Sequence, residues 1–141
     1  NDTKESIHVQ EAIAYIKNYY SQKITVEDIA DYLALNRSYL YTIFMNSLGI
    51  SPKDFLTKFR ISRGKEKLTL TDLSVEEIAV SCGYRNSFAF GKVFKQQMGM
   101  TPTQYRNDNR RAARERLIRA QNELKEYKKH KTIYVGDIEK E

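Results

Sequence analysis

Apolar residues in this chain recur at the three- and four-residue spacing of helices rather than the two-residue spacing of strands. In the second half, a helix is predicted over Ser87–Met98, and its apolar face holds Phe90, Val93 and Phe94. A shorter apolar face precedes it, formed by Ile78, Ala79 and Cys82. Gly83 lies between the two faces and accepts a positive φ without steric cost. The pattern predicts two short helices that meet at a turn.

The same arrangement occurs twice along the chain. Residues 25–30 reappear as residues 74–79 at an offset of 49, and residues 48–52 reappear as residues 98–102 at an offset of 50. A turn between Ala30 and Leu40 absorbs the extra residue. Two copies are too few for a stacked solenoid, so the sequence predicts a duplicated small module.

Local signals at the helix ends support this interpretation. Ser74 and Glu77 form a capping box at a helix start, and Thr101–Gln104 repeats the pattern ahead of a further short helix. In the first copy, Ala34 stands where the second copy has Gly83. Both copies therefore predict the same pair of helices.

A helix pair with a tight turn and a small residue where the helices cross is typical of the helix-turn-helix motif. Ala30 and Ala79 supply that small residue. One copy alone fits an ordinary helical hairpin equally well, but two copies at matched spacing favour the motif. Between them, Pro52–Leu68 predicts one long helix that would act as a rigid spacer, in which Gly64 marks either a local bend or close packing.

These residues resemble a known signature, that of the AraC/XylS family of bacterial transcription regulators. The matching positions are Ile78, Ala79, Cys82, Gly83, Tyr84, Phe90, Val93, Phe94, Lys95, Gly99, Thr101, Pro102, Tyr105 and Arg106. The resemblance covers roughly residues 7–106. It implies an all-α domain of seven helices, whose two recognition helices, 37–47 and 87–98, enter successive major grooves on one side of the duplex.

Two departures from the family concern base reading rather than the fold. Gly64 replaces the usual alanine, and residues 89–92 replace an aromatic-Phe-Ser-Arg run. The expected organisation is a first helix-turn-helix subdomain at 1–50, a linking helix at 51–69, a second subdomain at 70–106, and a basic amphipathic C-terminal helix with a frayed tail at 107–141. Larger family members carry an N-terminal sensing and dimerising domain, and none is visible here. A first residue that is not methionine suggests processing or excision from something longer, although small single-domain members of the family exist.

Helical geometry selects the outward faces without help from the resemblance. The residues opposite the buried faces that we predict to contact bases are Ser38, Tyr41, Thr42, Phe88, Gly91 and Lys92. Hydroxyls suit base edges, a lysine suits guanine O6 and N7, and a phenyl ring suits thymine methyls. These positions also coincide with those the family uses for base contacts. The alternative for each is a solvated surface residue.

Two of these residues carry a specific alternative. The Phe88 ring either contacts DNA or folds back beside Tyr84, and Gly91 either admits close approach of the groove or accommodates packing. Phosphate or flanking contacts are predicted around the same helices, where helix N-termini and basic side chains grip the backbone. This second set contains Arg37, Met45, Arg85, Asn86, Ser87 and Lys95.

Composition narrows the picture only where charge is considered by region. The net charge is +6, but residues 1–105 carry 13 Lys+Arg and 11 Asp+Glu, whereas residues 106–141 carry 11 and 7. DNA recognition by the paired modules would therefore depend on a few placed residues rather than on bulk charge.

Several other classes of protein are disfavoured. The longest apolar run, Ala12–Ile16, is far too short to cross a membrane. The one cysteine, Cys82, cannot form an internal disulfide and is expected to be a small buried hydrophobe, which favours a reducing cytoplasm. His8 and His130 lie in different segments, so neither a metal site nor a cofactor is expected. No catalytic motif points to an enzyme.

The last segment gives a weaker signal. Apolar residues follow spacings of 4, 3, 4 and 3 at Ala113, Leu117, Ala120, Leu124 and Tyr127, among several arginines. Two heptads fall short of a coiled coil, so docking on the same chain, a partner or dimer contact, and phosphate binding all stay open. Residues 132–135 have strand character but no visible strand partner.

The expected partner is double-stranded DNA. The alternative function is a protein-interaction module that contacts the transcription machinery, such as RNA polymerase. A homodimer would form through a missing N-terminal domain or through the C-terminal helix.

Overall fold

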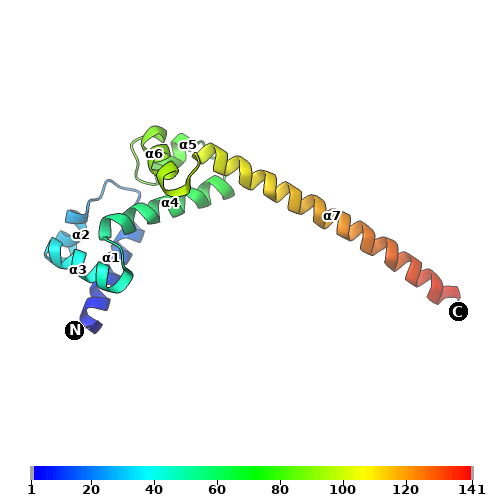
Figure 1. Cartoon of the computed structure of the whole chain (residues 1–141), viewed down its shortest axis with the longest axis horizontal. Coiled ribbons are helices and arrows are strands. Elements are labelled where there is room, and N and C mark those ends of the chain that lie inside the picture. Colours follow the sequence, from blue (N-terminus) through cyan, green and yellow to red (C-terminus); the bar gives the residue numbers. More distant parts are fainter. Residues whose placement is uncertain (1, 141) are drawn as a thin grey trace. The chain divides into compact units, whose positions relative to one another are not determined.

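The computed structural model describes the backbone of residues 2–140 and the side chains of residues 4–131. That part of the chain forms seven helices and no strand, which confirms the predicted all-α class (Figure 1). The helices are α1 (Asp2–Tyr19), α2 (Val26–Leu33), α3 (Arg37–Leu48), α4 (Pro52–Leu70), α5 (Val75–Ser81), α6 (Ser87–Met98) and α7 (Pro102–Lys140). Two compact units result, residues 1–105 and residues 106–141.

The first module packs α1, α2 and α3 around a core of its own. Its buried residues are Val9, Ala12, Ile16, Ile29, Ala30, Leu40, Ile43, Phe44 and Leu56. The sequence pattern did not single out α1, although Val9, Ala12 and Ile16 have the spacing of one helix face. Helix α1 matters because it supplies a third of the core on which the helix-turn-helix pair α2 and α3 rests.

The second module repeats this arrangement with a separate core. Its buried residues are Ile61, Leu68, Ile78, Ala79, Cys82, Phe90 and Phe94. Cys82 is fully buried, as predicted. Val93, predicted to be buried, is half-buried and packs at the edge of this core.

Helix α4 belongs to both cores. Leu56 in its first half packs into the first core, whereas Ile61 and Leu68 pack into the second. Each such side chain contributes about 1.5–3 kcal/mol when fully buried, so the helix is anchored at both ends. The prediction of one continuous linking helix is confirmed, and α4 extends two residues beyond the predicted end.

Side-chain caps fix the starts of the helices. The Thr25 hydroxyl accepts from the backbone N–H of Asp28, and the Asp28 carboxylate accepts from that of Thr25. Ser74 accepts from the backbone N–H of Glu77 in the matching place, as its capping motif predicts. Duplicated sequence signals thus produce duplicated helix boundaries.

The turns inside the two modules use the same backbone shape with different residues. Ala34 has a φ of 54° and Gly83 a φ of 90°. A left-handed conformation costs an L-residue about 1–2 kcal/mol relative to glycine. The repeat therefore imposes a conformation on Ala34 that its own side chain disfavours.

Gly64 permits close packing between α4 and α6. A Cβ atom placed on it would lie 2.7 Å and 2.8 Å from the Cζ and Cε1 atoms of the Phe90 ring. That ring is fully buried and packs against Tyr84 and Phe94 at centroid distances of 5.5 Å. Close packing, one of the two alternatives that the sequence left open, therefore accounts for this glycine.

The C-terminal region differs from prediction. The short helix expected after Thr101 is the start of α7, which runs without interruption to Lys140 and includes residues 132–135. The expected strand character there was wrong, and the physical reason for one long helix is that no glycine or proline occurs between Thr103 and Val135. Among the α7 residues whose side chains are described, Leu117, Ile118, Leu124 and Tyr127 are exposed.

We predict that Gly64→Ala lowers the free energy of unfolding by about 1–2 kcal/mol, because overpacking against Phe90 outweighs the gain in helix propensity. Gly91→Ala in α6 is the matched control, since a Cβ there meets only Pro102 Cδ, at 3.9 Å. It should raise stability by about 0.5–1 kcal/mol. Urea unfolding followed by circular dichroism measures the change in the free energy of unfolding for both variants. Changes of the same sign in Gly64→Ala and Gly91→Ala would contradict the packing explanation.

Candidate nucleic-acid interface

Helix α3 presents one apolar and one exposed face. Leu40, Ile43 and Phe44 are fully buried, while the opposite side carries the predicted contact residues. The members of that side, all exposed, are Arg37, Ser38, Tyr41, Thr42 and Met45. The structure therefore gathers the whole predicted set of the first module on one accessible surface.

Two internal hydrogen bonds shape the chemistry of this face. Thr42 Oγ1 donates to the Ser38 carbonyl at 3.0 Å, so its hydroxyl proton is used within the helix and the oxygen is left as an acceptor. Asn36 Oδ1 accepts from the backbone N–H of Ser38 at 2.7 Å and caps the helix. Sequence reasoning missed Asn36, although its match to Asn86 at the offset of 50 was a visible signal.

Helix α6 repeats the two-faced arrangement. Its buried face is Phe90 and Phe94, and Lys92 and Lys95 are exposed. The Phe88 ring is 80% exposed, and Tyr84 packs against Phe90 instead. The alternative in which Phe88 folds back beside Tyr84 is therefore wrong.

Gly91 lies on the same helix, and a Cβ atom placed on it would have few close neighbours. The nearest heavy atom to that Cβ is Pro102 Cδ at 3.9 Å, an ordinary contact. Packing within the protein therefore does not require a glycine, which contradicts the accommodation alternative. The absence of a side chain leaves the α6 backbone open to a close neighbour on this side.

The start of α6 is occupied by groups of the protein itself. Asn86 Oδ1 caps the helix by accepting from the backbone N–H of Ala89 at 2.9 Å. Glu76 Oε2 accepts from the backbone N–H of Ser87 at 2.8 Å, and hydrogen bonds from Ser87 hold the pKa of Glu76 below its usual range. Asn86 and Ser87 thus have structural roles, and Arg85 beside them is exposed. Sequence reasoning missed Glu76, which lies 11 residues from its partner.

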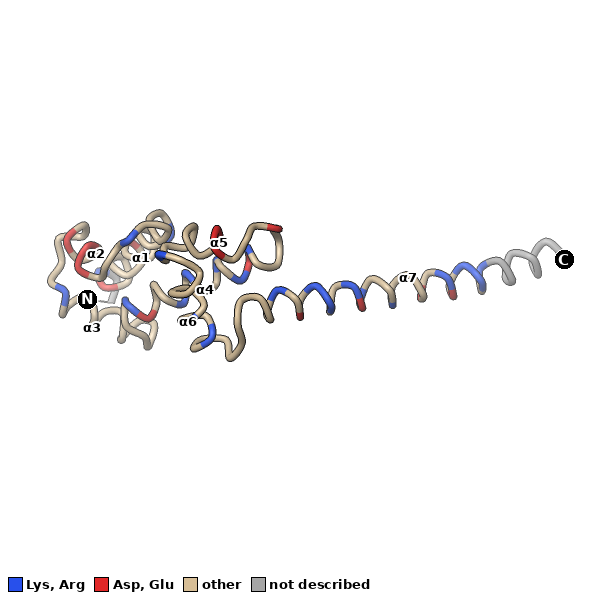
Figure 2. Tube along the Cα trace, turned by 90° about the horizontal axis from the view of Figure 1, so that it is seen from above, with Lys and Arg blue, Asp and Glu red and all other residues tan. Residues whose placement is uncertain are grey.

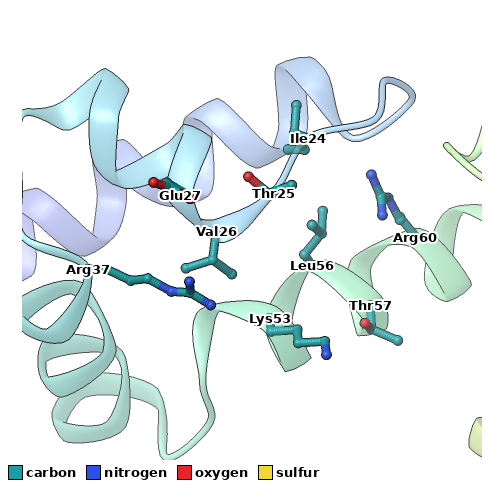
Figure 3. A pocket seen from close by; sticks show the side chains of 9 residues that line it. All are labelled: Ile24, Thr25, Val26, Glu27, Arg37, Lys53, Leu56, Thr57 and Arg60. Carbon is teal, nitrogen blue, oxygen red and sulfur yellow. The ribbon is translucent and has the colours of Figure 1, made fainter.

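The start of α3 differs because a basic cleft borders it. The cleft has a volume of about 420 Å³ between the start of α2, the start of α3 and one side of α4 (Figure 3). Three cationic side chains line it, Arg37, Lys53 and Arg60, against the single carboxylate of Glu27. No sequence signal links Lys53 to Arg37, because they lie on different helices.

Charge is distributed unevenly over the described residues. Acidic residues gather along α2, whereas Lys and Arg mark much of α7 (Figure 2). No group of three or more His, Cys, Asp or Glu side chains in the described region could hold a metal ion. None of the described helices combines the length and apolar character that a membrane span needs.

Two helix-turn-helix modules on one shared helix, each with an exposed recognition face, are the architecture of a double helix-turn-helix DNA-binding domain. Comparison with known proteins agrees. A family model described as "Helix-turn-helix domain" matches residues 29–108. The raffinose operon transcriptional regulatory protein of Pediococcus pentosaceus is 42% identical over 95 residues, which cover 67% of this chain and 34% of that protein.

Solved structures show the same similarity. The C-terminal domain of AraT, a response regulator from Geobacillus stearothermophilus, superimposes with a TM-score of 0.70 at 37% identity, covering 72% of this chain and 84% of that one. The DNA-binding domain of the transcriptional factor AdpA, solved with a target DNA, gives a TM-score of 0.70 at 27% identity, covering 73% and 93%.

The chain belongs to the AraC-type family of helix-turn-helix transcription regulators, whose domains bind DNA in a sequence-specific way. It covers 33–39% of the length of the raffinose, Msm and melibiose operon regulatory proteins that it matches. The resemblance predicted from residues 78–106 is thereby confirmed.

We predict a pH-dependent stabilisation from Glu76. Its pKa in the folded state lies below the ordinary value of 4.5, so its contribution is complete above about pH 4.5 and is lost as the pH falls through the folded pKa. Wild type should unfold at a higher temperature than Glu76→Gln at pH 7, and the difference should shrink in acid. A difference that stays constant with pH would contradict this role.

Proposed function

We propose that this chain binds DNA by inserting α3 and α6 into two successive major grooves on one side of the duplex. The observation that carries the proposal is that both recognition helices have an exposed face and are held by the same helix, α4. Successive grooves on one side of B-DNA are about 34 Å apart. A rigid shared helix suits that requirement, because the two helices must enter together.

Within this binding mode the two modules read bases differently. In the first, Ser38, Tyr41 and Thr42 offer hydroxyl groups, with Thr42 acting as an acceptor. In the second, Phe88 offers an apolar ring for thymine methyls and Lys92 a donor for guanine, while Gly91 lets the groove approach the backbone. The base-contacting face of the first module is thus the more polar, and that of the second module is the more apolar.

Backbone phosphates would be bound around these faces. Arg37 and Lys53 line the basic cleft at the start of α3, and Arg85 and Lys95 flank α6. Met45 is exposed beside Tyr41 at the edge of the first face. Because Glu76 occupies the Ser87 N–H, we assign more phosphate binding to the first module than to the second.

The DNA-binding role also bears on where the protein acts. We place the protein in the cytoplasm, as a transcription regulator that performs no catalytic step of its own. The exposed apolar residues of α7, Leu117 and Leu124 among them, favour a protein partner for that helix. Either a second copy of the chain or RNA polymerase would be a suitable partner for α7. A homodimer would also form through a dimerising domain elsewhere in a longer protein.

Selection of preferred duplexes from a random DNA pool tests this function. Thr42→Ala and Lys92→Ala should each relax base preference, and the two changes should map about one helical turn, 10 base pairs, apart. Lys17→Ala, an exposed residue of α1, is the control and should leave the selected sequence unchanged. Changes that map to the same base pairs would contradict the two-groove geometry.

Gly91→Ala separates DNA binding from folding. It should stabilise the free protein through helix propensity, yet weaken binding to the selected duplex by about tenfold, or 1.4 kcal/mol, because the added methyl group obstructs the groove. Fluorescence anisotropy at fixed salt measures the dissociation constant. Unchanged affinity would show that the α6 backbone does not approach the DNA closely.

A further inference from the structure

Arg60 lies where the two modules of the domain meet. Its Nε donates to the Tyr20 carbonyl at 3.0 Å, and its Nη2 donates to the Gln22 carbonyl at 2.7 Å. Both carbonyls belong to the connection that follows α1, so one guanidinium on α4 joins the linking helix to the first module. These bonds span 38 and 40 residues of sequence.

The second module contacts the same guanidinium group. The guanidinium carbon of Arg60 lies 5.8 Å from the centre of the Tyr84 ring. A Cβ placed on Gly83 would collide with the Tyr20 carbonyl and lie 2.9 Å from Arg60 Nε. The turn of the second module is therefore packed directly against both the arginine and the carbonyl that the arginine binds.

The chemistry of the Arg60 guanidinium restricts how its neighbours can move relative to one another. Burial lowers the pKa of Arg60, while Tyr84 and Cys82 favour its charged form, and a guanidinium stays protonated throughout the neutral range. Its planar fork binds two carbonyls in a fixed orientation while the guanidinium lies over an aromatic ring. A lysine amine lacks this planar fork. A half-buried cation held in this way permits few relative positions of its three neighbours.

We propose that Arg60 is the residue that fixes the distance and angle between α3 and α6, and thereby the spacing of the two DNA half-sites that the domain accepts. The proposal rests on the two-groove binding mode proposed above. Arg60 acts as a positioning residue, because it holds the modules and needs no base contact of its own. Its effect is therefore on the spacing of the half-sites rather than on their sequences.

The experiment measures dissociation constants for duplexes that carry both selected half-sites with zero, one or two base pairs inserted or removed between them. One base pair turns a half-site by about 34°, so wild type should lose about tenfold in affinity for each step. Arg60→Met should lose about tenfold at the optimal spacing but differ by only about threefold between neighbouring spacings. Arg60→Met also removes one of the three cations of the basic cleft, so Arg60→Lys, which keeps that charge, is the variant whose affinity for a single half-site should equal that of wild type.

Two further variants separate geometry from charge. Arg60→Lys keeps the charge but not the fork, so its spacing profile should be broad, like that of Arg60→Met. Arg63→Met is the matched control on the same helix, because Arg63 pairs with Glu66 and lies over Phe59 within α4. It should keep the narrow wild-type profile. Circular dichroism establishes whether each variant is folded. If Arg60→Met does not fold, the spacing profile of Arg60→Lys alone decides the result.

Three results would overturn the proposal. A variant that loses the same factor at every spacing and on the single half-site would give Arg60 a role only in stability or charge. A narrow profile retained in both Arg60 variants would exclude the positioning role. A wild-type protein that binds each half-site but shows no preferred spacing would instead contradict the two-groove mode itself.

Discussion

The junction at Arg60 is the constraint on which the arrangement of the domain depends. Each module has its own hydrophobic core, and neither core by itself determines where the other module lies. Helix α4 enters both cores, and the Arg60 guanidinium adds the connection after α1 and the Tyr84 ring to the same point. Gly83 keeps this junction closed, because a larger residue would collide with the Tyr20 carbonyl. The two modules are thereby held together as one DNA-binding unit.

The duplicated modules share a backbone but differ in chemistry. The caps at Thr25 and Ser74 and the turns at Ala34 and Gly83 repeat one design. An asparagine caps the start of each recognition helix, but the surroundings of the two starts differ. A basic cleft with Arg37 and Lys53 borders α3, whereas the carboxylate of Glu76 binds the first turn of α6. Under the proposed binding mode, the first module is thus the better suited to phosphates and the second to apolar base edges.

Local signals in the sequence predicted most of the fold. Helical spacing, capping residues and the repeat placed α6 at Ser87–Met98 and, apart from Val93, separated the exposed from the buried residues of both recognition helices. Contacts between distant segments could not be predicted, because nothing local marks them: Arg60 binds carbonyls about 40 residues away, and Glu76 binds Ser87 across a turn. The length of α7 was misjudged because strand-forming residues at 132–135 outweighed the missing helix breaker.

In the proposed binding mode, both recognition helices contact one side of the duplex together. Hydroxyl-radical footprinting of the chain on its selected duplex tests it most directly, since this method maps backbone protection at single-nucleotide resolution. Two protected segments about 10 base pairs apart on the same side of the DNA helix are expected. A single protected segment, or two on opposite sides of the duplex, would contradict this binding mode.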